Sequence, residues 1–65
     1  MTTVPTGLLI IRAWAEPGST QPLRAHISRT TDVGLGVQRE HTLAEVDAVC
    51  AEVQQWLIEM ATNRP

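Results

Sequence analysis

The most constraining feature of the sequence is a regular spacing of apolar residues in its last third. Between positions 43 and 60, apolar side chains recur every three or four residues, which places them on one face of an α-helix. The stripe contains Leu43, Val46, Val49, Cys50, Val53, Trp56, Leu57 and Met60. Just before it, Thr42 and Glu45 have the spacing of a capping box, in which two side chains bond reciprocally to backbone N–H groups. The sequence therefore predicts a helix over residues 42–61.

Two segments before this helix have the patterns of β-strands. Residues 8–16 are rich in β-favouring residues and end at the turn signal Pro17-Gly18, and residues 23–33 alternate apolar and polar side chains. We expect them to pair as an antiparallel hairpin over residues 8–33, with residues 1–6 as a flexible arm. A third strand over residues 35–39 stays open, because its nearby glycines equally favour a plain connector.

The parity of the side chains predicts how the hairpin is packed. A slip of one residue would move every side chain to the other face, and the consistent register puts the odd-numbered residues of both strands together. The odd face contains Leu9, Ile11, Ala13, Ala15, Leu23, Ala25 and Ile27. We expect the apolar stripe of the helix to cover this face, while Glu45, Glu52 and Glu59, spaced seven apart, face solvent.

These elements predict an α+β fold. It consists of an antiparallel β-hairpin or three-stranded meander followed by one long C-terminal amphipathic helix, in one domain of 65 residues. A chain of this size buries only about 60% of its unfolded surface, and the absence of Phe and Tyr keeps its core small. Four apolar side chains remain uncovered in this arrangement: Leu8, Ile10, Trp14 and Ile58. We interpret them as interface candidates and predict a homodimer.

A second hypothesis concerns the outer face of the hairpin. Trp14 is expected there among basic groups, a combination that sheets binding single-stranded nucleic acid use. The candidate basic residues are Arg12, Arg24, His26 and Arg29. The net charge of −2 opposes general attraction to nucleic acid. We therefore favour a small protein–protein interaction or accessory protein, with a nucleic-acid-binding or regulatory module as the alternative.

The sequence contains no pattern typical of a catalytic or metal site. Its two histidines and single cysteine, His26, His41 and Cys50, are 15 and 9 positions apart, without the close pairs of zinc sites. His26 and Ser28 share one side of a strand, as alternation alone requires. We expect no enzyme activity, no cofactor and no metal.

The apolar segments are too short for a membrane protein. The run from Leu8 to Ile11 is four residues long, whereas a transmembrane helix needs about 20 apolar residues. The start of the sequence also lacks the pattern of a secretory signal. We expect a cytoplasmic protein with no membrane partner. All five basic residues are Arg, which we interpret as typical of a GC-rich bacterial genome.

Overall fold

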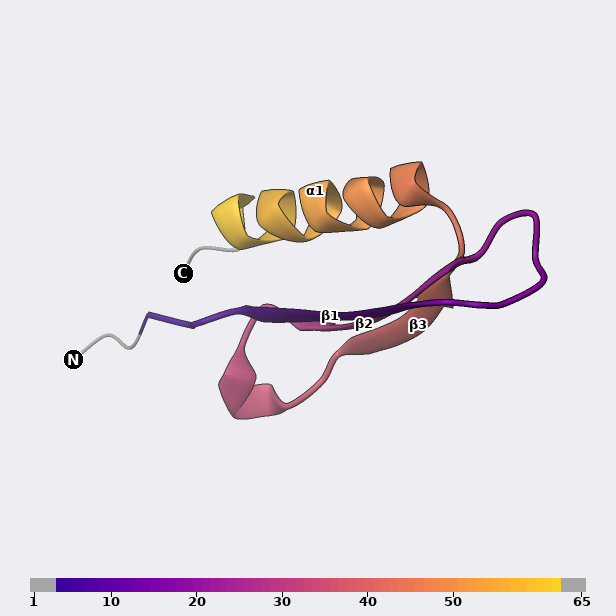
Figure 1. Cartoon of the computed structure of the whole chain (residues 1–65). Helices are drawn as coiled ribbons and strands as arrows, with labels where there is room; N and C mark the ends of the chain where they lie inside the picture. The colour runs from indigo at the N-terminus through magenta and orange to yellow at the C-terminus, as the bar shows by residue number, and fades with distance from the viewer. Residues whose placement is uncertain (1–3, 63–65) are drawn as a thin grey trace.

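The computed structural model describes residues 4–62 as a sheet covered on one face by a helix (Figure 1). The elements are β1 (Leu8–Ala15), β2 (Leu23–Thr30), the 3-10 turn η1 (Val33–Leu35), β3 (Arg39–Leu43) and α1 (Val46–Thr62). The strands are antiparallel and lie in the order β1-β2-β3. The predicted α+β fold, a three-stranded meander followed by one C-terminal helix, is confirmed.

The pairing of β1 with β2 has the predicted parity. Ile11 lies opposite Ile27 and Ala13 lies opposite Ala25, so the odd-numbered side chains share the face under α1. Ile27 and Ala25 are 0% and 2% exposed, and they are the only buried apolar side chains within residues 4–62. Both belong to β2, because the central strand has a neighbour on each side as well as the helix above it.

The third strand is present, but it lies later in the sequence than the segment considered for it. An Asp32 carboxylate oxygen accepts a hydrogen bond from the Gly34 N–H at 2.9 Å, and Gly36 has a φ of +79°, a conformation that suits glycine. The chain therefore turns through η1 where we had considered a strand. As a result β2 ends at Thr30 instead of residue 33, and β3 begins at Arg39.

The predicted start of the helix is wrong by four residues. Thr42 and Leu43 belong to β3, where Leu43 pairs with Ala25 and Thr42 Oγ1 lies 3.1 Å from a ring nitrogen of His26. Because Leu43 is extended in the ladder with β2, it cannot take the helical conformation that the residue after a Thr42 cap would need. The first turn of α1 instead includes a hydrogen bond from the Val49 N–H to the Glu45 carbonyl at 3.1 Å.

The helix is also rotated relative to its predicted orientation. Its half-buried side chains are Ala48, Val49, Glu52, Val53, Trp56, Glu59 and Met60. Val46 and Leu57, expected to cover the sheet, are 64% and 53% exposed, and Cys50 is exposed too. The expectation that Glu52 and Glu59 face solvent is wrong, because both bind a cation on the sheet.

Candidate interaction site

The cation that orients the helix is Arg29. Its side chain is 4% exposed, and its Nη1 lies 3.0 Å from Glu52 Oε1, in an ion pair that lacks the alignment of a hydrogen bond. Its Nη2 donates a hydrogen bond to Glu59 at 2.6 Å. The other Glu52 oxygen lies 3.3 Å from His41 Nε2 on β3. These contacts fasten α1 over β2 and towards β3.

Arg29 therefore does not join the predicted nucleic-acid face. It has the odd parity of the helix-covered side, whereas the outer face carries the even-numbered residues Arg12, Arg24 and His26. A buried guanidinium held by two carboxylates is unavailable to a phosphate. The structure assigns this residue to the interior of the fold.

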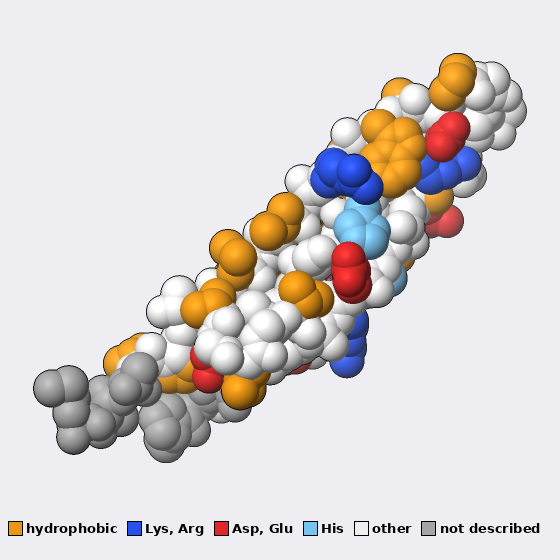
Figure 2. All heavy atoms as spheres, turned by 90° about the horizontal axis from the view of Figure 1, so that it is seen from below, with side chains coloured by type: hydrophobic (Ala, Val, Ile, Leu, Met, Phe, Trp, Pro, Cys, Tyr) orange, Lys and Arg blue, Asp and Glu red, His pale blue; other side chains and the backbone are white. Residues whose placement is uncertain are grey.

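The outer face of the sheet has no helix over it. Figure 2 views the molecule from this side, with hydrophobic side chains along one edge and charged groups gathered further along the sheet. Arg12 Cζ lies 5.3 Å from the Trp14 ring centroid, within the range of a cation–π interaction. Trp14 Nε1 donates a hydrogen bond to Glu16 at 3.2 Å. Trp14 thus contacts a cation of its own strand and an anion just after the strand ends.

The other two basic residues of this face are engaged within the chain. His26 Nε2 lies 2.9 Å from a Glu40 carboxylate oxygen. Arg24 Nη1 donates hydrogen bonds to the backbone carbonyls of Gln21 and Leu23, both at 2.7 Å. These two residues, predicted to attract phosphates, therefore have partners in the same chain, and Glu40 adds negative charge beside them.

The four interface candidates do not form one patch. Leu8, Ile10 and Trp14 are exposed on alternate positions of β1, and so they line the outer face of one strand. Ile58 is exposed on α1, in the opposite layer of the fold. The structure brings three of the four together and places the fourth elsewhere.

The sequence analysis missed a second apolar surface, on the helix side of β1. Ile11, Ala13 and Ala15 have the core parity but remain exposed, and Ile11 is 42% exposed. The helix packs chiefly on β2 and leaves the edge strand uncovered. The sequence position of Arg29 could have indicated this orientation of the helix. Its odd number places a cation on the helix-covered face of the sheet, where glutamates of the helix could bind it.

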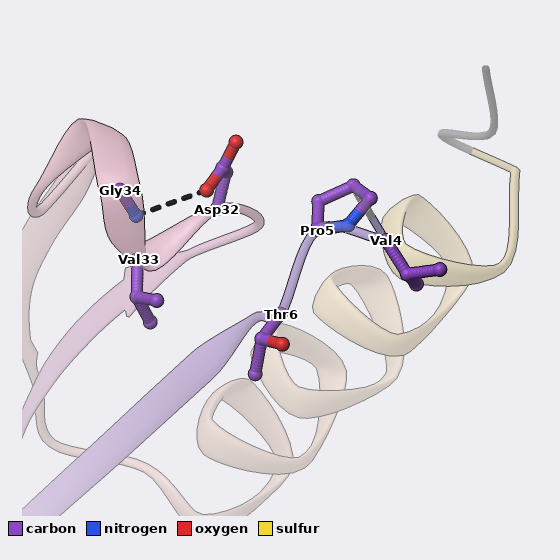
Figure 3. A pocket seen from close by; sticks show the side chains of 6 residues that line it. All are labelled: Val4, Pro5, Thr6, Asp32, Val33 and Gly34. Carbon is purple, nitrogen blue, oxygen red and sulfur yellow. Dashed lines mark hydrogen bonds between the residues drawn. The ribbon is translucent and has the colours of Figure 1, made fainter. Parts of the chain in front are cut away.

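A shallow hollow of about 340 Å³ lies beside the chain segment that precedes β1 (Figure 3). It is lined by Val4, Pro5, Thr6, Asp32, Val33 and Gly34. Asp32 is the one ionisable residue of this lining, and its carboxylate already binds the Gly34 N–H. Among residues 4–62 no three His, Cys, Asp or Glu side chains gather in a way that could hold a metal ion.

Comparison with protein-family models, curated proteins and solved structures finds no match to this chain. Its surfaces are therefore the guide to what it binds. Within residues 4–62 no helix is both long and apolar enough to cross a membrane.

Proposed function

We propose that this chain is a small cytoplasmic protein–protein interaction or accessory protein, without enzymatic activity, that works as a homodimer. The observation that carries the proposal is the imbalance between buried and exposed apolar side chains. In the described part of the chain two apolar side chains are buried, whereas eleven large ones are exposed. Exposed apolar groups in this proportion are typical of surfaces that bind another protein.

The overall dimensions support the same proposal. A folded monomer of 7.1 kDa is expected to expose about 4,100 Å², whereas this chain exposes 4835 Å². Its radius of gyration is 14.2 Å, compared with about 11 Å for a compact domain of this length. The excess area is of the same order as the roughly 800 Å² that each partner loses in a standard interface.

Analytical ultracentrifugation tests the proposed self-association. At tens of micromolar we expect the sedimenting species to have twice the chain mass of 7.1 kDa, with dissociation on dilution. A constant monomeric mass across that range would contradict the dimer. The assay needs no ligand and uses the whole chain.

The cation–π contact of Arg12 with Trp14 keeps nucleic acid as a second candidate ligand. Retention on immobilised single-stranded DNA at low salt, lost steeply as salt rises and lost again in Trp14→Ala, would support it. Because Glu16 and Glu40 place negative charge on the same face, we expect no retention. Binding to heparin alone would indicate only nonspecific charge attraction.

A further inference from the structure

The open edge of β1 presents backbone groups that have no partner strand. The Glu16 N–H donates to the Pro22 carbonyl at 2.7 Å, and the Thr6 carbonyl accepts from Val33 at 2.9 Å. Backbone bonding alternates along an antiparallel ladder, so even-numbered residues of β1 bond towards β2. The odd-numbered residues Leu9, Ile11 and Ala13 therefore direct their N–H and C=O groups to the open edge.

The two edges of the sheet differ in their protection against pairing. β3 has five residues and includes Arg39, Glu40 and His41, and short charged edges resist association. β1 has eight residues and starts with four consecutive apolar ones. Its first charge is Arg12, and it contains no proline. β1 therefore has the properties of an edge that requires a partner.

An apolar flank of the helix lies over this same edge. A Glu52 carboxylate oxygen lies 3.3 Å from His41 Nε2 of β3, so that side of α1 faces β3, and Met60 lies against Gly7 just before β1. The turn of the helix places Val46, Cys50 and Leu57 on the β1 side of α1. This helix flank and the exposed residues on the helix side of β1 line an apolar corner. The corner is open to solvent at the edge of the sheet.

We propose that the occupant of this corner is a second copy of the chain, paired antiparallel through β1. The inference rests on the proposed self-association and specifies its geometry. A twofold axis perpendicular to the sheet makes a continuous six-stranded sheet with both helices on one face. Such an isologous interface buries the same corner on both copies. The backbone N–H and C=O groups at the open edge of each β1 would form hydrogen bonds with those of the other.

Side-chain parity and charge select the register. Odd residues must lie opposite odd residues for both helices to share a face, so the axis passes through one residue of β1. An axis at Arg12 would set two guanidinium groups opposite each other, which is unfavourable. An axis at Ile11 instead sets Arg12 opposite the partner's Ile10 and Trp14 opposite the partner's Leu8. The same register thus pairs the exposed apolar residues of the outer face.

The spacing of the layers fixes how the two helices would lie. The two β2 strands would be three strand spacings apart, about 14 Å, which exceeds the 8–10 Å between helices in direct contact. The Val46, Cys50 and Leu57 flanks of the two helices would therefore face each other across the paired β1 strands.

Single-cysteine variants test both the edge and the register. In a Cys50→Ala background, Ile11→Cys places two thiols opposite each other with a Cα separation of about 5.5 Å, which a disulfide can span. We expect a predominant covalent dimer on a non-reducing gel after mild oxidation. Ala13→Cys is the matched control on the same strand and face, with its thiols displaced about 13 Å along the strand, and we expect it to remain uncrosslinked.

The outcomes separate this inference from the proposed function. Preferential crosslinking of Arg12→Cys would overturn the register. If neither Ile11→Cys nor Arg12→Cys crosslinks while the Cys50→Ala parent sediments as a dimer, both registers are wrong and self-association stands; absence of crosslinking from a cysteine at every position of β1 would overturn the edge pairing itself. A monomeric parent with wild-type circular dichroism would overturn both.

Discussion

Arg29 shows how one side chain can determine the orientation of a whole element. Its odd position on β2 directs it under the helix, where the guanidinium binds Glu52 and Glu59. The same two glutamates could face solvent only if the cation were left alone in the interior, which is costly. The helix therefore turns its glutamates inward and exposes part of its apolar stripe.

Replacing Arg29 by methionine should destabilise the fold strongly. The change leaves the Glu52 carboxylate, whose side chain is 17% exposed, without its cation, and breaking a buried ion pair costs about 3–5 kcal/mol. Urea unfolding followed by circular dichroism measures the loss. Arg39→Met, an exposed position on β3, is the matched control and should change the free energy of unfolding by less than about 0.5 kcal/mol.

A second substitution distinguishes loss of charge balance from loss of packing. Combining Arg29→Met with Glu52→Met removes both members of the pair, and the double variant should recover most of the lost stability. If the double variant is no more stable than Arg29→Met alone, the ion pair does not explain the burial of Arg29.

The two tryptophans should respond differently to truncation. Trp56 is half-buried on the side of α1 that faces the sheet, and its Nε1 donates a hydrogen bond to the Thr30 carbonyl at 3.0 Å, so Trp56→Ala should cost about 3–5 kcal/mol. Trp14 is exposed on the outer face, and its change to Ala should keep the helix signal in circular dichroism while weakening association in sedimentation. An unfolded Trp14→Ala beside a folded Trp56→Ala would reverse these assignments.

At the level of elements, features that depend on the periodicity of the sequence were predicted. Features that depend on pairing between residues far apart in the chain were not. The β-favouring residues of 8–16 and the alternation in residues 23–33 were sufficient to predict the hairpin and its parity, although β1 ends at Ala15 and β2 at Thr30. The capping box at Thr42 was a local signal, and it was overridden because Leu43 completes the ladder with Ala25. No pattern within six residues of Thr42 carries that information, since the pairing joins positions far apart in the chain.

The observed helix start predicts a stabilising substitution. Glu45 stands at the N-cap position, since its carbonyl accepts the first helical hydrogen bond, and Asp caps helices far better than residues without a short polar side chain. Glu45→Asp keeps the charge and should raise the free energy of unfolding by about 0.5–1 kcal/mol. Thr42→Ala should leave the helix content in circular dichroism unchanged, whereas a loss of helix content would restore the predicted capping box.

For the whole molecule, the candidate site could be predicted only in part. The outer row of Leu8, Ile10 and Trp14 followed from parity, because residues 4–62 contain a single α-helix and it lies on the other face of the sheet. The apolar corner under the helix did not, because its exposure depends on the rotation of α1, and that rotation follows from contacts of Arg29 and His41 made across the fold. Amphipathic spacing identifies a helix face but does not say how far the face extends over the sheet.

The thermal stability of the whole molecule should depend on concentration. If two chains complete each other's core, unfolding is coupled to dissociation, and a tenfold dilution lowers the apparent free energy of unfolding by about 1.4 kcal/mol per dimer. Melting curves at several concentrations, recorded by circular dichroism, should shift to lower midpoints on dilution. A midpoint that does not move with concentration would show that the single chain folds by itself.

The two-residue connection between β3 and α1 determines whether each copy keeps its own helix or exchanges it with its partner. Leu43 and Val46 are joined through Ala44 and Glu45 alone, so they can be at most about 11 Å apart. The partner's β2 would lie about 19 Å from β3 in the six-stranded sheet. In the proposed dimer each copy would therefore keep its own helix, without domain swapping, and subunits would exchange between dimers by separating one strand edge without unfolding either chain.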